Sequence, residues 1–282
     1  MALVDISFSE LPNFEGNFDP EKLAEALFSL NFTKKAKIVQ NGIEVQVRNE
    51  PQNTNLNSSN TSTKEFSASH WVYLNNDRTL ALHIMSSKLI LKCTKYDCFS
   101  TFNDLLKRCI DVCEAEISHF DTVPVQKIGL RYVDLIIPKP SQDLNDYLNE
   151  EWHAPTSFKE VGAGRKLMMN RTTQILEDGE IKLRVDSAQF EPKNGMPISV
   201  IPSDLSDRDE SSMQLYFTPW MEESFAAQKN YVILDIDASL QDNLNCSPKE
   251  ALDKLSSLRL AVRDSFKTCI TENAEREWGY YE

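Results

Sequence analysis

The sequence predicts an α+β fold made of two similar halves, each a strand, a helix, a meander of antiparallel strands and a long helix. Short segments alternate apolar and polar residues as strands do, two long segments carry apolar residues at helical spacing, and this order of elements occurs twice. The first half covers 1–122, the second covers 126–272, and an acidic, aromatic tail occupies 273–282. The two meanders could join side by side as one curved sheet covered by the helices.

The first half opens with a short strand and a capped helix. Residues 3–9 alternate as a strand does, and Asp19 is a favourable N-cap for a helix with Pro20 at its first position. The apolar stripe of this helix consists of Leu23, Ala26, Leu27 and Leu30. Their spacing places them on one face, which we expect to be buried.

A hairpin, a polar loop, a meander and a long helix follow. Residues 36–48 predict a hairpin, because Asn41-Gly42 is a favourable two-residue turn. Residues 51–69, rich in Asn, Ser and Thr, predict a mobile loop. The meander has strands at 70–75, 79–85 and 88–95, and the helix capped near Ser100 has an apolar stripe of Phe102, Leu106, Cys109, Ile110, Cys113, Ile117 and Phe120.

The second half repeats this order from a strand at 127–137. We expect a short helix at 142–150, a hairpin turning at Asp178-Gly179, an acidic loop at 191–211, and strands at 212–218 and 230–239. The last helix has the clearest start in the chain, because Ser247 and Glu250 form a capping box around Pro248. Its predicted buried face consists of Leu252, Leu255, Leu258, Val262, Phe266 and Ile270.

The N-terminus and the distribution of apolar residues predict the compartment. The first sixteen residues, MALVDISFSELPNFEG, have no basic region ahead of an apolar stretch, and no apolar run approaches the ~20 residues of a membrane span. We therefore expect a cytoplasmic protein without membrane association. The six cysteines, at 93, 98, 109, 113, 246 and 269, are then expected to be reduced thiols.

The charge distribution bears on the class of partner. The formal net charge is -13, of which residues 1–140 contribute -2 and residues 141–282 contribute -11. Nucleic-acid binders gain most of their affinity from a basic surface that neutralises phosphates. We therefore consider a nucleic-acid partner unfavoured, although a local basic groove in the near-neutral first half stays open. The acidic second half favours solubility or a basic protein partner.

Three blocks of the sequence carry a resemblance. The first runs from His70-Trp71-Val72-Tyr73 to Tyr96 and Phe99, the second is Lys127-Ile128-Gly129-Leu130-Arg131-Tyr132-Val133-Asp134, and the third is Leu234-Asp235-Ile236-Asp237. They resemble a sporadically distributed, uncharacterised bacterial protein family whose middle block is an Arg-Ile-Gly-Leu-Arg-Tyr-Ile-Asn type motif. The chain departs from that motif at Lys127 and Asp134. The resemblance implies a bacterial accessory-genome protein and supplies no catalytic residues.

The middle block concentrates polar side chains within a strand. Alternation places Tyr132 and Asp134 on one face and Arg131 on the other. Arg131 could bind a carboxylate or phosphate with both arms of its guanidinium. It could instead pair with Asp235 or Asp237 on an adjoining strand, and we favour this pair because a buried charge needs a partner. Gly129 predicts a bulge or a close backbone approach.

Metal and cofactor sites are not favoured by the sequence. Asp235 and Asp237 face the same way and could bind a divalent cation with a third acidic ligand, but a solvated strand face gives the same pattern. Cys109 and Cys113 lie on the apolar stripe of a helix, where cysteine behaves as a small hydrophobe rather than as a zinc ligand. We therefore expect no metal and no cofactor.

The remaining candidate binding residues are basic or aromatic. Arg165 and Lys166 follow Gly162-Ala163-Gly164 in a predicted flexible loop, which lacks the strand and helix context of a phosphate-binding loop. With Arg131 and Arg171 they are our candidates for contacting phosphate. Tyr132 and Trp220 complete the set of candidate binding residues, because aromatic side chains beside charges often anchor protein partners. The aromatic tail could serve the same purpose or dock on the chain itself.

These observations favour a non-enzymatic interaction or regulatory protein of the bacterial cytoplasm that acts through a protein partner or as a sensor. The sporadic distribution of the resembled family suggests a role in a mobile-element or phage-defence module. The alternative is a nucleotide- or nucleic-acid-binding protein, or a metal-dependent phosphoryl-transfer enzyme, that uses Arg131 with Asp235 and Asp237. Self-association as a homo-oligomer is compatible with both interpretations.

Overall fold

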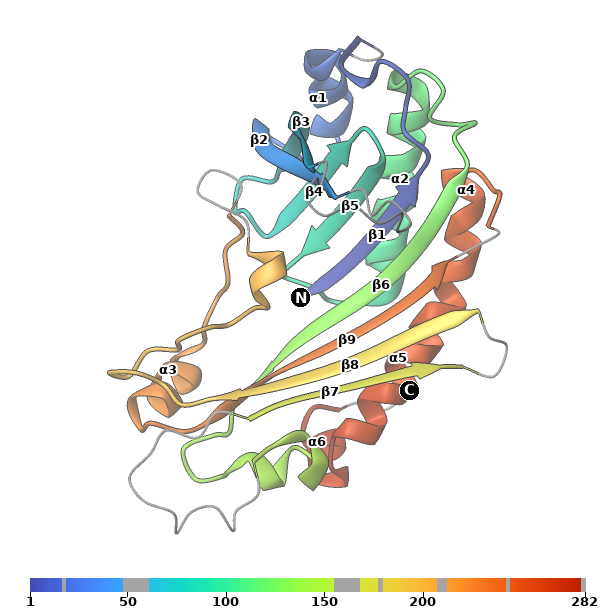
Figure 1. Cartoon of the computed structure of the whole chain (residues 1–282). Helices are drawn as coiled ribbons and strands as arrows, with labels where there is room; N and C mark the ends of the chain where they lie inside the picture. The colour runs from blue at the N-terminus through green and yellow to red at the C-terminus, as the bar shows by residue number, and fades with distance from the viewer. Residues whose placement is uncertain are drawn as a thin grey trace, which may run out of the picture.

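The computed structural model describes residues 1–16, 19–47, 61–154, 168–176, 180–206, 212–241 and 244–279 (Figure 1). Its strands are β1 (Ala2–Phe8), β2 (Lys34–Val47), β3 (Thr61–Leu74), β4 (Leu80–Met85), β5 (Lys88–Cys93), β6 (Val125–Ile136), β7 (Met168–Ile175), β8 (Ile181–Phe190) and β9 (Tyr231–Gln241). Its helices are α1 (Pro20–Phe28), α2 (Phe99–Glu116), α3 (Pro219–Ala226), α4 (Pro248–Ala251), α5 (Leu255–Cys269) and α6 (Glu272–Glu277). The fold class is α+β, as predicted.

All these strands form one antiparallel sheet in the order β2-β3-β4-β5-β1-β6-β9-β8-β7. The strands of the predicted first half lie on one side of the β1–β6 pair, and those of the second half lie on the other side (Figure 1). β6 pairs with β1 on one edge and with β9 on the other, so the predicted strand at 127–137 lies at the centre of the sheet. Leu3 is opposite Arg131 in the first pair and Asp237 is opposite Arg131 in the second.

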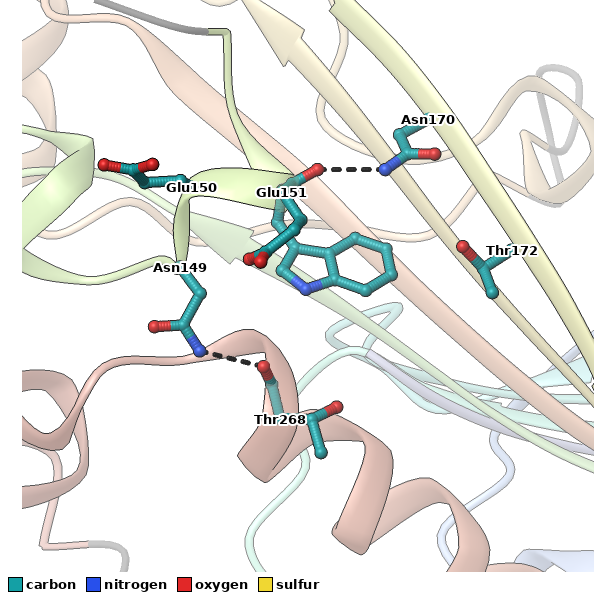
Figure 2. A pocket seen from close by; sticks show the side chains of 7 residues that line it. Asn149, Glu150, Glu151, Asn170, Thr172 and Thr268 are labelled. Carbon is teal, nitrogen blue, oxygen red and sulfur yellow. Dashed lines mark hydrogen bonds between the residues drawn. The ribbon is translucent and has the colours of Figure 1, made fainter.

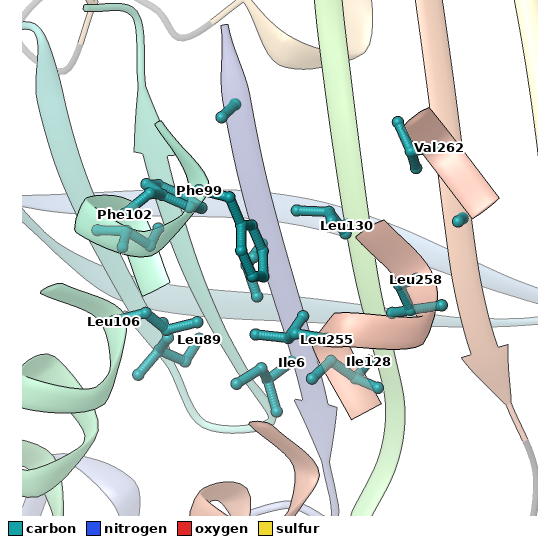
Figure 3. Packing of buried hydrophobic residues seen from close by; sticks show 14 of the residues in the cluster. Ile6, Leu89, Phe99, Phe102, Leu106, Ile128, Leu130, Leu255, Leu258 and Val262 are labelled. Atoms are coloured by element: carbon teal, nitrogen blue, oxygen red, sulfur yellow. The ribbon is translucent and has the colours of Figure 1, made fainter. Parts of the chain in front are cut away.

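The main hydrophobic core lies between the sheet and the helices that cover one of its faces. Figure 3 shows Phe99 and Leu106 of α2 and Leu258 of α5 packed over central strands, above residues such as Ile6 of β1 and Leu130 of β6. One continuous cluster of buried apolar residues therefore includes members of both predicted halves. Capping signals explain where α1 and α4 begin, because Asp19 accepts from the Glu21 amide and Ser247 and Glu250 form the expected capping box.

The opposite face of the sheet is partly covered by residues 191–206, 212–218 and α3. Leu205 packs against Leu3, Val133 and Ile233, while Met213 packs against Val72 and Leu74. Phe225 of α3 completes this cover by packing on Ile137 and Tyr231. The sheet therefore has two differently covered faces, and alternation assigns each β6 side chain to one of them. Among the described residues, no helix combines the length and apolar character needed to cross a membrane.

Two element predictions in the first half are wrong. Residues 36–48 do not turn at Asn41-Gly42: β2 is one strand from Lys34 to Val47, and Gly42 is opposite Phe66 in the long pairing with β3. Sheet pairing therefore overrides the local turn preference. β3 begins at Thr61, so the last nine residues of the predicted loop 51–69 are strand, and residues 51–60 lie outside the described residues.

The second half contains the other corrections. In place of a helix at 142–150, the chain makes two 3-10 turns, η2 (Leu144–Asp146) and η3 (Glu150–Trp152). Asp143 and Asn149 bond to backbone groups locally and on α5, which competes with a continuous helix. Residues 212–218 do not pair with the sheet, and α3 was not predicted. A Cβ on Gly129 would meet its nearest atoms at 3.6 Å, an ordinary contact, so the predicted close approach there is also wrong.

Three buried basic side chains lie together on the face of the sheet opposite the helices. His70, His83 and Lys92 are buried side chains of β3, β4 and β5, and the two imidazole rings lie 5.7 Å apart. Burial lowers the pKa of His83 well below its ordinary value, and the charges of Lys92 and His70 lower it further. The folded protein therefore keeps His83 neutral at pH values where the unfolded chain binds a proton.

We expect His83 to make the folded state less stable in mild acid. The unfolded state gains a proton on this side chain below about pH 6.5, so the free energy of unfolding falls by up to ~1.4 kcal/mol per pH unit until the lowered folded pKa is reached. In His83→Gln this loss is absent. Urea denaturation at pH 7.5, 6.5 and 5.5 measures it: the difference between wild type and variant must change over this range, and a constant difference would contradict the prediction.

Candidate functional site

A cavity of about 600 Å³ lies on the helix-covered side of the sheet, between the start of α2 and the α5 helix. Its floor comes from β6 and β9 of the predicted second half, and residues 96–99 of the predicted first half line its other side, so it lies where the two predicted halves meet. This volume falls in the ~300–1,000 Å³ range of small-molecule sites. The lining residues are Tyr96, Asp97, Cys98, Phe99, Tyr132, Asp134, Ile236, Arg259, Val262, Arg263, Phe266, Trp278 and Gly279.

Aromatic rings form much of the cavity wall. Tyr96 meets Tyr132 edge-to-face, with ring centroids 5.2 Å apart and an interplanar angle of 74°. On the far side, the Trp278 ring is 6.3 Å from Phe266 and stacks on Tyr147 at 5.4 Å, with the two planes 8° apart. These contacts fix the rings from several different elements, so the wall is a preformed apolar surface.

Tyr132 and Asp134 supply the polar groups of the floor. The hydroxyls of Tyr132 and Tyr96 are hydrogen-bonded at 2.8 Å, and burial together with this bond raises the pKa of Tyr132. Desolvation raises the pKa of Asp134, and Asp235 raises it further, against the opposing effect of the N-terminal ammonium. The Asp134 carboxyl makes no hydrogen bond or ion pair to any other described residue, so its acceptor capacity is open to a ligand.

Two arginines of α5 line the cavity one helical turn apart. The guanidinium of Arg259 lies over the Phe99 ring, 4.8 Å from its centroid. Arg263 donates from Nε and Nη2 to Oδ1 of Asp264, both at 3.0 Å. Both guanidinium groups therefore have a partner within the protein, one an aromatic face and the other a carboxylate.

Cys98, which is the N-cap residue of α2, also lines this cavity. Its Sγ lies 3.2 Å from Oγ of Ser100 and 3.1 Å from Oγ1 of Thr101, and these hydroxyls lower the pKa of the thiol. Cys109 differs from it, because burial raises the pKa of that thiol to about 12. Exposure and thiolate character therefore coincide at Cys98.

We expect Cys98 to be alkylated before the other five cysteines. Only the thiolate is nucleophilic, and Cys98 combines solvent exposure with a lowered pKa, whereas Cys109, Cys113 and Cys269 are buried. Limiting iodoacetamide at pH 7.5, followed by peptide mass spectrometry, measures the order of modification. First labelling at Cys93 or Cys246, the two half-buried thiols, would contradict the prediction.

The face of β6 opposite the cavity carries Arg131 in a buried ion-pair network. Arg131 donates from Nε and Nη2 to the two carboxylate oxygens of Asp235, at 2.7 and 2.6 Å. Its Nη1 donates to Asp204 at 2.6 Å. Desolvation lowers the pKa of Arg131, but the bonds to Asp235 and Asp204 outweigh it and raise the pKa overall. The predicted pair between Arg131 and Asp235 is confirmed.

The other predicted site residues are not brought to the cavity, apart from Tyr132. Arg171 on β7 pairs with Asp186 of β8 on an exposed surface, and Trp220 of α3 packs beside the cluster around Phe225. Arg165 and Lys166 lie outside the described residues. Asp237 lies 3.3 Å from Nη2 of Arg184. Within the described parts of the chain, no three His, Cys, Asp or Glu side chains gather as a metal site.

The tail docks on the chain itself over its described part. Trp278 stacks on Tyr147, and Glu277 accepts from the Tyr147 hydroxyl and from the amide of Gln142. Lys139 lies 2.5 Å from the Glu277 carboxylate, and its bond lowers the pKa of Glu277. The tail therefore supplies one wall of the cavity through Trp278.

A second, more open hollow of about 750 Å³ lies beside η3 and β7 (Figure 2). Its amide side chains are engaged within the fold: Asn149 donates to the Thr268 carbonyl, and Asn170 donates to the Glu151 carbonyl, both at 2.9 Å. These bonds hold the η3 turn between α5 and β7. We therefore regard the cavity around Asp134 as the candidate functional site.

Tyr132 is the predicted binding residue that lies in this cavity, and the other lining residues were not among the predicted site residues. The shared face of Tyr132 and Asp134 was visible from strand alternation, but Asp134 was not selected as a candidate. Tyr96 and Cys98 come from the β5–α2 connection, Arg259 comes from α5, and Trp278 comes from the tail. Two of these segments gave a signal: the β5–α2 connection, as the Tyr96 and Phe99 end of a resembled block, and the aromatic tail, which was expected to contact a partner or to dock on the chain itself.

Comparisons with known proteins add no functional assignment. No family model and no curated protein matches the chain. A solved structure, the di-domain ARO/CYC StfQ from the steffimycin biosynthetic pathway, matches with a TM-score of 0.20 and 7% identity over 99% of each chain. Similarity at this level supports no argument about fold or function, so the site must be interpreted from its own geometry.

Proposed function

We propose that this protein is a non-enzymatic regulatory protein that senses a small molecule in the cavity around Asp134 and acts through a protein partner. The observation that carries the proposal is a preformed, largely aromatic cavity whose floor carboxyl lacks a partner among the described residues. Apolar pockets with a few convergent polar groups and perturbed pKa values are typical of ligand sites. The bacterial cytoplasm and a mobile-element or phage-defence module remain part of this proposal, through the resemblance to the bacterial family.

The arrangement of charges favours this proposal over a phosphate-binding or phosphoryl-transfer function. That alternative requires Arg131 to bind phosphate and Asp235 to bind a metal ion. In the fold these two side chains bind each other through two short hydrogen bonds, so either role would first have to break a buried pair. Asp134 and Tyr132, by contrast, need no rearrangement to meet a ligand.

We also infer that the chain consists of two related halves. β1, α1, the strands to β5, and α2 form one set, while β6, the strands to β9, and α5 form the other. Support comes from the pairing of the two leading strands, β1 and β6, at the centre of the sheet. Such an origin would make the cavity an interface between halves, a frequent location of ligand sites in proteins with two units.

The function is tested by affinity selection of small molecules. The purified protein is incubated with a bacterial metabolite extract, separated by rapid gel filtration, and its bound compounds are identified by mass spectrometry. Cys98→Trp is the control, because a large side chain at this exposed N-cap obstructs the cavity without entering the buried core. We expect compounds retained by the wild type and lost from the variant at unchanged melting temperature. Equal retention by both, or no retention together with nuclease or phosphatase activity, would contradict the proposal.

We expect the Asp134 side chain to lower the free energy of unfolding, as ligand-binding residues often do. Its raised pKa means that the folded state takes up a proton more readily than the unfolded state does, so its ionised form destabilises the fold as pH rises above about 4. We expect Asp134→Asn to raise the free energy of unfolding by about 0.5–2 kcal/mol at pH 7, and by less at pH 4. Urea denaturation at both pH values measures this, and a variant less stable at pH 7 would show that Asp134 has a stabilising role.

A further inference from the structure

We propose that the cavity binds a small organic ammonium ion, with the cationic group against Asp134 and an aromatic or branched aliphatic body between the rings. This inference rests on the proposed sensing function and specifies the ligand class of the same site. Three features of the cavity support this ligand class: the charged side chains that already have partners, the aromatic rings beside Asp134, and the apolar walls.

Among the charged side chains of the cavity, the carboxyl of Asp134 is a polar group that requires a partner. Arg263 is engaged by Asp264 and Arg259 lies over the Phe99 ring, so both cations in the lining are already accommodated. Asp134 and Asp97 make no ion pair with any described residue. A ligand that enters with a positive charge gains the interaction that the Asp134 carboxyl lacks, on the side of this carboxyl away from the N-terminal ammonium and from Arg259, whose charges act on Asp134 and on Tyr132.

The hydroxyls and rings beside Asp134 suit an ammonium group. Tyr132 lies two residues before Asp134 on the same face of β6, and its hydroxyl, bonded to Tyr96, retains acceptor capacity for a donor. The edge-to-face pair of Tyr96 and Tyr132 presents an aromatic face near this position, and aromatic faces attract cations. A primary amine has three donors, which the carboxyl and the hydroxyl pair can accept together.

The apolar lining of the cavity determines the part of the ligand that does not carry the ammonium group. Phe266 and Trp278 on one side, and Ile236 and Val262 of the floor and of α5, offer apolar contact. A fully polar polyamine or a bare ammonium ion would leave this surface without a partner, while an aromatic or branched aliphatic body buries it. The aromatic rings are held by their own contacts, so little ordering opposes binding.

The test uses three probes with a phenyl ring and a short chain: 2-phenylethylamine, 2-phenylethanol and 3-phenylpropionate. Isothermal titration calorimetry at pH 7.5 measures each affinity, and protection of Cys98 from iodoacetamide shows whether the probe occupies this cavity. Wild type is compared with Asp134→Asn and with Asp237→Asn, the same change on the neighbouring strand but on the opposite face of the sheet. Tyr132→Phe is a second cavity variant that keeps the ring and removes the hydroxyl.

We expect the amine to bind most tightly and to protect Cys98. Loss of a charged hydrogen bond predicts about 10- to 100-fold weaker binding in Asp134→Asn, with a smaller loss in Tyr132→Phe and none in Asp237→Asn. Tighter binding of the alcohol or the carboxylate, with Cys98 protection, would overturn the ammonium assignment and leave the sensing function standing. If none of the three probes binds, the assignment is wrong, and the metabolite selection then decides separately whether the cavity binds another class.

Discussion

Arg131→Met is expected to lower the free energy of unfolding by about 3–5 kcal/mol, because it leaves the Asp235 carboxylate buried without its partner. The side chain of Arg131 is 9% exposed and that of Asp235 is 5% exposed, so water cannot replace the two lost hydrogen bonds. For domains stabilised by ~5–15 kcal/mol this loss is a large fraction of the total. Urea denaturation followed by circular dichroism measures it.

Two further variants separate the buried pair from its surroundings. Arg171→Met removes a two-armed pair with Asp186, at 2.8 and 2.7 Å, but the Arg171 side chain is 67% exposed, and we expect a far smaller loss than from Arg131→Met. Arg131→Met combined with Asp235→Leu removes both charges beside the apolar cluster of Leu3, Val133 and Ile233, and should recover most of the loss. Equal losses from Arg131→Met and Arg171→Met would contradict the structural role of the buried pair.

Leu258→Ala is expected to lower the free energy of unfolding by about 2–5 kcal/mol, through lost burial and the cavity it leaves. Leu258 is fully buried on α5 and packs over the central strands, near Leu255 and Leu130 (Figure 3). Its removal weakens the attachment of α5, which carries Arg259 and Phe266 to the candidate site. The same denaturation measurement applies.

The matched control lies two residues further along the same helix. Leu260 is 49% exposed, so Leu260→Ala should change the free energy of unfolding by no more than ~0.5 kcal/mol. Both changes remove the same atoms from α5 and differ only in which way the side chain points. Similar losses at the two positions would mean that α5 does not pack on the sheet through the face that carries Leu258.

Local signals predicted the elements, and pairing over long sequence distances determined the rest. Alternation located β6 and β9, and the capping residues located α1 and α4, because these features depend on neighbouring residues. The predicted turn at Asn41-Gly42 is wrong because β2 continues through these residues in its pairing with β3. The local sequence gives no information about this contact with a distant segment. The same limit made residues 212–218 resemble a strand, although their apolar side chain Met213 packs on top of the sheet.

The candidate site was predicted in part, for a related reason. Strand alternation separated Arg131 from Tyr132 and Asp134, and the structure confirms that separation along with the pairing of Arg131 with Asp235. Strand alternation could not predict that α2, α5 and the tail enclose Tyr132 and Asp134, because these segments meet only in the folded chain. Arg171 and Trp220 were selected by residue type, and both lie away from the cavity.

The central claim is that β6 stabilises the fold through one face and binds a ligand through the other. The most direct measurement is metabolite selection, as above, on two variants: Asp134→Asn and the double change Arg131→Met with Asp235→Leu. The account predicts that Asp134→Asn remains folded and loses the compounds that the wild type retains, while the double variant keeps them. The claim is contradicted if the double variant loses the compounds at intact stability while Asp134→Asn retains them.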